Sequence, residues 1–330
     1  MTDPIVIAAG MKNRITSTVL KNITPAPPTG PTFDLVNGDF VIHEGQTNLA
    51  SVKTFEIDGE AKVEIRVYGA GAGGPTDGGR GGNNKGEYTL VENRKYVCIV
   101  GGSGNFAGGR SSSGAGGASA FMFTPPSGPA GGTDAYPGAT EVLVAGGGGS
   151  DKAGFGGHGG GGPEGLSGGR TPNALRSPPM YGGGASGSTG GVGGIGPRRS
   201  GSAGANAPRG TGANSVTDGS GQAAGGVSPY AKGGDGGTIG PDTGSGAGGG
   251  GYAGGGGGGG DQGGIGGGGG NGYAHPDVTN RVHGQGQTFA GDPGQYGALT
   301  PGIGYQGAIV ISVYPTPSTM TSFNPSAPYT

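Results

Sequence analysis

One stretch of the sequence, Gly69–Gly74, fits the spacing of a dinucleotide-binding loop. Its glycines at Gly69, Gly71 and Gly74 directly follow an apolar run that favours a strand. A pyrophosphate site also needs a helix N-terminus after the glycines and an acidic residue about twenty positions further on. Pro75 and more glycines follow instead, without helical periodicity. We therefore interpret the match as a product of glycine-rich composition, and we expect no cofactor.

Histidines are the other residues that could bind a metal or catalyse a reaction. The four of them are His43, His158, His275 and His283. They are isolated in sequence, and only the segment that holds His275, His283 and Asp277 brings several candidate ligands together. An aspartate among glycines at 234–237 is similar to calcium-binding repeats, but the nonapeptide period is missing. Because these ligands are isolated, the chain is predicted to have no metal site. No nucleophile elbow follows a strand either, so the chain is predicted to be no enzyme.

Glycine dominates the composition, since 91 of the 330 residues are Gly and a further 25 are Pro. Only 12% of the residues are charged, and 19 scattered basic residues are balanced by 21 acidic ones. This balance favours neither a nucleic-acid partner nor a highly charged disordered coil. The single cysteine, Cys98, lies in an apolar run and cannot form an internal disulfide, so we predict that it is a buried core residue.

Targeting signals are missing from the pattern of the sequence. The first residues lack a basic region followed by an apolar one, and no run approaches the roughly 20 apolar residues of a membrane span. We expect synthesis in a host cytoplasm without membrane insertion. An extracellular location then requires a non-classical route, and assembly into a virion is the simplest one.

Residues 1–30 are predicted to form a short helix followed by a proline-rich linker. Apolar residues recur every four positions in this segment, at Met11, Ile15, Val19 and Ile23. A narrow stripe of this kind indicates docking onto another subunit or self-association. Packing of the helix on the chain's own β-domain is an equally open alternative.

Residues 31–147 are typical of short strands separated by turns. The runs Phe33–Val36 and Phe40–His43 flank Asn37-Gly38, which is a hairpin signal. Apolar and polar residues alternate in Lys62–Tyr68, so one face of that strand is expected to be buried. Further strands are predicted at Lys53–Asp58, Glu87–Val91, Tyr96–Val100, Ser119–Thr124 and Glu141–Ala145.

A last clear strand, Ala308–Tyr314, follows far along the chain and needs the earlier sheet as its partner. We therefore predict a β-sandwich built from residues 31–147 plus 305–315, with a C-terminal tail at 316–330. The intervening residues 148–304 form an insert in which glycine comes in clusters, without the strict Gly-X-Y period of collagen.

The insert is predicted to be a bundle of polyglycine II helices. Such a helix has about three residues per turn and a rise of about 3.1 Å, and its backbone polar groups point outwards. Glycine has no Cβ, so neighbouring helices can approach closely enough to hydrogen-bond directly. We expect roughly ten helices of about 10–12 residues, packed side by side. The alternative is a disordered linker.

Several runs, taken in order, carry a family resemblance: Val63–Gly74, Gly86–Tyr88, Tyr96–Gly102, Gly116–Ser119, Val142–Gly149 and Gly307–Ile311. Together they resemble the glycine-rich domain found in phage tail-fibre proteins and in the ectodomain of the anaplastic lymphoma kinase receptor. The resemblance spans roughly residues 55–315 and implies a jelly-roll-like sandwich with packed polyglycine II helices. The insert also resembles the distal adhesins of T-even-like phages, whose polyglycine helices present variable recognition loops. Unlike those adhesins, this chain carries a clear β-framework.

Segments with bulky side chains interrupt the glycine clusters at Arg170–Tyr181, Pro197–Arg209, Val227–Lys232 and Asn271–Phe289. We expect them to form turns at the bundle ends, because their side chains do not fit between glycine helices. Their aromatic and arginine residues are the candidate receptor-binding residues: Tyr181, Arg198, Arg199, Arg209, Tyr230, Tyr273, Arg281 and Phe289.

With the resemblance, these segments favour a homo-oligomeric protein of a virion surface or tail fibre that binds a host cell-surface receptor. Other virion or fibre subunits are then the expected partners of the N-terminal segment. The alternative is a purely structural subunit of a fibre, a capsid or an extracellular matrix, without a receptor.

Overall fold

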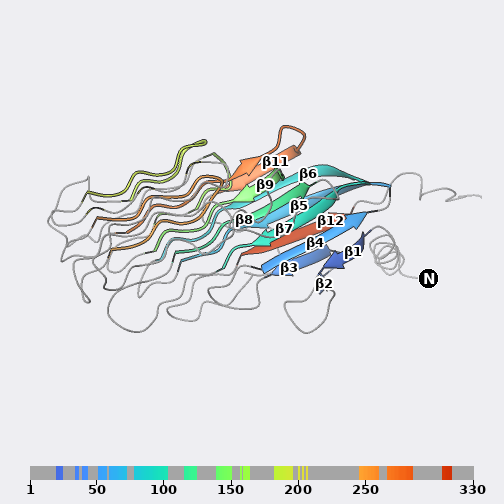
Figure 1. Cartoon of the computed structure of the whole chain (residues 1–330), viewed down its shortest axis with the longest axis horizontal. Coiled ribbons are helices and arrows are strands. Elements are labelled where there is room, and N and C mark those ends of the chain that lie inside the picture. The colour runs from blue at the N-terminus through green and yellow to red at the C-terminus, as the bar shows by residue number, and fades with distance from the viewer. Residues whose placement is uncertain are drawn as a thin grey trace, which may run out of the picture.

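The computed structural model consists of two antiparallel β-sheets joined to a set of glycine-rich segments that run side by side (Figure 1). It describes residues 20–24, 34–36, 39–43, 51–57, 59–72, 78–102, 115–124, 139–150, 157, 159–163, 182–195, 200, 203, 206, 245–259, 266–284 and 307–313. Within these ranges every regular element is a strand. The prediction of a mainly β fold is therefore confirmed. No described residue belongs to a helix with the length and hydropathy needed to cross a bilayer.

The first sheet has the strand order β1-β4-β7-β8-β9-β10. Its strands are β1 (Leu20–Thr24), β4 (Ser51–Ile57), β7 (Lys95–Val100), β8 (Ser119–Thr124), β9 (Thr140–Ala145) and β10 (Tyr273–Ala274). The second sheet has the order β11-β6-β5-β12-β3-β2. Its strands are β2 (Asp34–Val36), β3 (Asp39–His43), β5 (Glu60–Tyr68), β6 (Asn83–Val91), β11 (Thr279–Gly284) and β12 (Ala308–Val313).

Two sequence signals are confirmed by the strand pairing. β2 and β3 pair antiparallel on either side of residues 37–38, as the Asn-Gly hairpin signal predicts. β12 lies between β3 and β5, and Ile311 is paired with both Phe40 and Ile65. The chain therefore returns to the second sheet after the glycine-rich segments, so both ends of that region are held by the framework.

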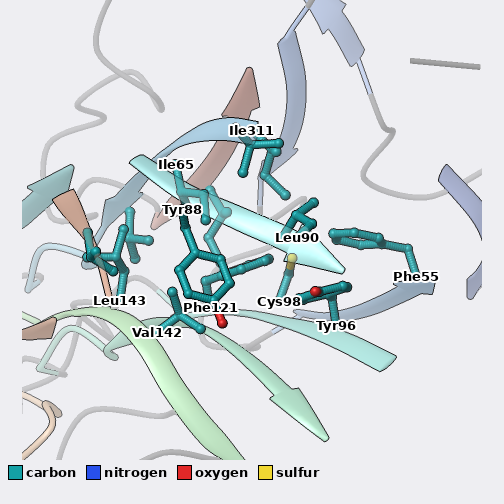
Figure 2. Packing of buried hydrophobic residues seen from close by; sticks show 14 of the residues in the cluster. Phe55, Ile65, Tyr88, Leu90, Tyr96, Cys98, Phe121, Val142, Leu143 and Ile311 are labelled. Carbon is teal, nitrogen blue, oxygen red and sulfur yellow. The ribbon is translucent and has the colours of Figure 1, made fainter. Parts of the chain in front are cut away.

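The core lies between the two sheets, because one buried cluster takes side chains from both of them (Figure 2). Alternate residues Val63, Ile65 and Val67 of β5 point into it, as the alternation in the sequence predicts. Aromatic rings fill its centre: the ring of Tyr96 stacks on Phe55 at 5.3 Å and on Phe121 at 5.7 Å. Cys98 is fully buried in the same cluster, as predicted, and burial raises the pKa of its thiol.

The N-terminal helix prediction is wrong where it reaches Ile23. Residues Leu20–Thr24 form strand β1, which pairs antiparallel with β4. The edge of β4 offers backbone hydrogen bonds that a four-residue periodicity cannot reveal, and β-branched Ile23 and Thr24 fit a strand well. The other stripe residues, Met11, Ile15 and Val19, lie outside the described residues.

Candidate functional site

Beyond the strands, the described glycine-rich segments bond to one another through their backbones. We call them the glycine lattice: residues 69–72, 78–82, 115–117, 146–150, 157, 159–162, 182–195, 245–259 and 266–272. In Figure 1 they continue from the strands as parallel wavy traces. The lattice includes glycines on both sides of the predicted insert boundary at residue 148, since 69–72, 78–82 and 115–117 belong to it as well.

Segment 146–150 shows how the lattice is bonded. Its successive N–H groups donate to three different neighbours and return to the same neighbour every third residue. The bonds run from Gly146 to Gly160 O, from Gly147 to Gly250 O, from Gly148 to Ala70 O, from Gly149 to Gly157 O and from Ser150 to Ala247 O, at 2.7 to 3.0 Å. The backbone of this segment therefore repeats its orientation every three residues.

The carbonyl groups of segment 146–150 follow the same period with three other neighbours. They accept in turn from the N–H groups of Gly82, Gly270, Gly116, Gly79 and Gly267, at 2.7 to 3.1 Å. The segment is thus surrounded by six neighbouring segments and bonds to each of them through the main chain. Side chains contribute none of these contacts, so backbone bonds hold this segment to its neighbours. At its end the buried Ser150 hydroxyl adds one side-chain contact, since it accepts from the N–H of Ala247 at 2.8 Å.

Close approach explains why this interior consists of glycine. Among the described glycines, only Gly59 and Gly187 have φ in the left-handed region, so backbone conformation does not demand glycine at the other positions. A Cβ added at Gly148 would overlap the carbonyl of Gly79, and one added at Gly149 would overlap the carbonyl of Gly267. A single methyl group at these positions would therefore force neighbouring segments apart.

Side chains return at the outer boundary of the lattice, again with a period of three. In segment 190–195, Gly191 and Gly194 are buried and donate to the neighbouring segment at Gly254 O and Gly257 O. Val192 and Ile195 follow them by one residue, and their side chains are 70% and 62% exposed. Positions on the outer face thus accept side chains that the interior excludes.

The most prominent side-chain group beside the lattice is a pair of stacked tyrosines. The rings of Tyr252 and Tyr273 lie 4.4 Å apart between centroids and 17° from parallel. Tyr252 comes from a turn of the lattice, whereas Tyr273 opens β10 and pairs with Val144 of β9. Both rings are half-buried against a second apolar cluster, on the face of the first sheet opposite the core. The pair therefore marks the junction between lattice and framework.

Charged groups lie close to this pair. Burial raises the pKa of the Tyr273 phenol, the negative charge of Glu141 raises it further, and the positive charge of Arg281 opposes both effects. Arg281 is exposed on β11, where Val282 is also 50% exposed. Aromatic, acidic and basic groups thus surround one corner of the framework, as recognition surfaces often require.

A tight turn between β10 and β11 completes the corner. His275 donates its N–H to Val142 O at 2.8 Å, and Val278 N–H donates to His275 O at 3.0 Å. The Nδ1 atom of His275 accepts from the N–H of Asp277 at 3.2 Å and lies 3.5 Å from its carboxylate. We call this group, Tyr252, Tyr273, His275, Asp277, Arg281 and Val282, the corner surface.

Two of the predicted receptor-binding residues, Tyr273 and Arg281, fall in this corner surface. Their predicted setting was wrong, however, because residues 273–284 are not a turn at a bundle end. They contain β10 and β11, which extend the two sheets at the framework end of the lattice. A polar, glycine-flanked sequence conceals such edge strands, since their pairing with β6 and β9 depends on distant residues.

The other predicted residues, Tyr181, Arg198, Arg199, Arg209, Tyr230 and Phe289, lie outside the described residues. Sequence reasoning missed Tyr252, although a lone aromatic residue between Gly248–Gly251 and Gly254 was a usable signal. Within the described ranges, no group of three or more His, Cys, Asp or Glu residues could hold a metal ion. The sequence matches no protein-family model, and no curated protein matches it.

Proposed function

We propose that this chain is a non-enzymatic surface-recognition protein, such as a virion surface or tail-fibre protein, in which a polyglycine II bundle forms a rigid scaffold. The three-residue period of the lattice hydrogen bonds supports the polyglycine II assignment, because such a helix has about three residues per turn and directs its backbone groups outwards. The jelly-roll-like framework remains part of the proposal.

The observation that carries the recognition role is the contrast between the lattice and the corner surface. The buried side chains of the lattice, such as those of Ser150, Ala247 and Asn271, are enclosed within it. The corner surface instead gathers aromatic and charged groups from β10, β11, the turn between them and the bend at Tyr252. Binding surfaces are built from such anchored aromatic and arginine residues. A host cell-surface receptor is the partner we propose, with the segments around Arg198 and Arg209 as a second contact region.

Binding of the labelled protein to host cells tests this role. Exposed Asp277, Arg281 and Val282 are to be replaced by Ala, Ala and Ser, because these changes spare the backbone pairing of β11 with β6. We expect the triple variant to lose about tenfold or more in affinity, since a few central residues carry most of the binding energy. The matched control is Thr89→Ala, which changes an exposed residue of β6 outside the corner surface, and this variant should bind normally.

A second triple variant, Arg198→Ala, Arg199→Ala and Arg209→Ala, tests the other contact region. Full adsorption by both triple variants would contradict the receptor role and would favour the purely structural subunit. Melting curves of each variant separate lost binding from lost folding.

Hydrogen exchange tests the scaffold itself. Within residues 245–257 and 266–272, some N–H groups are buried and donate to neighbouring segments, and their amides should exchange slowly, on a timescale of minutes or longer. They include the amides of Gly249, Gly250, Gly255, Gly256, Gly267, Gly268 and Gly270. Uniformly fast exchange throughout both segments would mean that the lattice is not a stable bundle in solution.

The N-terminal segment is proposed to dock the chain onto other subunits or onto copies of itself. Replacing Ile15 and Val19 with Asp would place charge in any such contact and should yield a folded protein that fails to assemble. Normal incorporation of this variant into the particle would show that the segment is not the anchor.

A further inference from the structure

One polar residue lies fully buried where the glycine lattice passes into the first sheet. Asn271 has no exposed surface, and its own backbone bonds to the turn at Tyr252 and Ala253 in both directions. Its carbonyl accepts from the N–H of Tyr252 at 2.9 Å, and its N–H donates to Ala253 O at 3.1 Å. The backbone of Asn271 is therefore bonded to a neighbouring segment independently of its side chain.

The side-chain amide of Asn271 then joins three turns. Its Oδ1 accepts from the N–H of Ala253 at 2.7 Å, and its Nδ2 donates to Pro163 O and Gly187 O, each at 2.8 Å. A side-chain amide has one carbonyl oxygen and two N–H hydrogens, and each of them makes a hydrogen bond here. No other side chain of this size supplies one acceptor and two donors in this geometry.

The residue after Asn271 makes this amide chemically vulnerable. Gly272 has no Cβ to hinder its backbone nitrogen from reaching Cγ of Asn271. In that reaction the nitrogen loses its proton and forms a bond to Cγ, the Cγ–Nδ2 bond breaks, and ammonia leaves. Water then opens the cyclic imide to aspartate or isoaspartate, so water is the only co-reactant and no electrons are exchanged.

The folded lattice blocks the first step of this reaction. The N–H of Gly272 donates to Gly162 O at 2.7 Å, which turns the nucleophilic nitrogen towards another segment. The amide that it must attack is held by the three hydrogen bonds to Ala253, Pro163 and Gly187. Ring closure needs both groups to be released, so it requires the lattice to open locally.

We propose that Asn271 is a latent deamidation site, protected while the lattice is closed, at which hydrolysis after opening permanently removes the tie between three turns. In the aspartate product a carboxylate stands where Nδ2 stood, and it has no hydrogen to donate to the carbonyl oxygens of Pro163 and Gly187. In the isoaspartate product the main chain itself runs through Cγ, so the side-chain amide and both of its N–H donors are lost as well. Unfolding of the lattice thus becomes irreversible with time, without any protease or oxidant.

Peptide mapping by mass spectrometry tests the protection. The folded protein and a synthetic peptide of residues 266–276 are incubated side by side in mildly alkaline buffer. We expect deamidation at residue 271 to be about a hundredfold slower in the folded protein, because opening of a buried, bonded segment is rare. Equal rates in protein and peptide would overturn the protection.

Refolding tests the consequence. The protein is aged in denaturant for increasing times, refolded, and separated into folded and unfolded pools. Modification at residue 271 should be at least about tenfold enriched in the unfolded pool, and loss of refolding should rise in parallel with it. Asn37, which also precedes a glycine, provides the internal comparison in the same samples. Equal modification of residue 271 in both pools would overturn the proposal.

Variants give an independent measurement. Asn271→Ala removes the three bonds without adding charge, whereas Asn271→Asp reproduces the aspartate product. The N–H of Gly187 donates to Pro163 O, and Asn271 Nδ2 bonds to the carbonyls of both residues. Hydrogen-exchange protection of Gly187 should therefore be reduced in the Ala variant and lost in the Asp variant, whose carboxylate repels these two carbonyls. Wild-type protection in the Asp variant would contradict the proposed consequence, and the ageing experiment still decides if that variant does not fold.

Discussion

Asn84 of β6 donates from Nδ2 to the carbonyl of Tyr273, 2.8 Å away, and also reaches Val144 O at 3.2 Å. One buried side chain of the second sheet thus holds the junction of β9 and β10 in the first sheet. Replacing Asn84 with Ala leaves both carbonyls without this donor and should lower the free energy of unfolding by about 1–3 kcal/mol. Denaturant unfolding measures the loss. Thr89→Ala, at an exposed position, should be nearly neutral. Equal losses in Asn84→Ala and Thr89→Ala would contradict a stabilising role of the Asn84 hydrogen bonds.

A methyl group inside the lattice should be costly. Gly268 donates to Gly256 O at 2.8 Å and accepts from Gly249 at 2.9 Å, and a Cβ there would overlap the carbonyl of Gly183. Gly268→Ala should destabilise the protein by about 2–4 kcal/mol, because backbone cannot move aside as a side chain can. Thermal melting gives the comparison with Ile195→Ala, which shortens an exposed side chain and should change stability little. A tolerated Gly268→Ala would mean that the lattice is loosely packed.

The hydroxyl of Tyr96 closes the turn between β6 and β7. It accepts from the N–H of Val91 at 2.7 Å and donates to Val91 O at 3.1 Å, while the ring fills the core. Tyr96→Phe keeps the ring and leaves both backbone groups unpaired by it, so we expect a loss of about 1–3 kcal/mol. Tyr88→Phe is the control, since its hydroxyl accepts only from the Arg94 side chain among the described contacts. Urea unfolding of both variants should rank Tyr96→Phe as the more destabilising.

Acid should weaken the second sheet through Glu64. Burial raises the pKa of this carboxyl, but hydrogen bonds and charges from Arg66 and Lys85 outweigh burial, and the net pKa is lowered. A lowered pKa in the folded state means that the stabilisation is present above the usual glutamate value of about 4.3 and is lost as the pH falls through the folded value. Glu64→Gln should therefore be less stable than wild type at neutral pH.

In acid, the stabilities of wild type and Glu64→Gln should become equal. The difference in unfolding midpoint between wild type and Glu64→Gln should shrink as the pH drops below about 4. A difference that stays constant across this range would show that the side-chain shape of Glu64, and not its charge, stabilises the sheet.

Local patterns were enough to predict most of the framework strands. The alternation in Lys62–Tyr68 identifies β5 because burial on one face follows directly from a two-residue period. β1 was missed because its pairing with β4 competes with a helical spacing, and sequence alone does not weigh a distant partner. Local signals thus find strands whose pattern reflects burial, and they miss strands defined by a neighbouring edge.

The candidate site was harder to predict for a related reason. Tyr273 and Arg281 were recognised by residue type, but their setting depends on β10 and β11 joining different sheets. Tyr252 owes its importance to the ring of Tyr273, which lies beside it only after the lattice has formed. Asn271 likewise looks like a turn residue in the sequence, and only the folded chain shows its three partners.

Because the bonding directions of segment 146–150 repeat every three residues, the number of residues in a lattice segment determines which neighbour each N–H faces. Deleting one residue would turn every later donor by about 120° around the segment axis, so each N–H would face the wrong neighbour. Deleting three residues would shorten the segment by about one turn and leave all directions unchanged. Length changes in related chains should therefore occur in threes inside the lattice, whereas the turns that join its segments are free of this restriction.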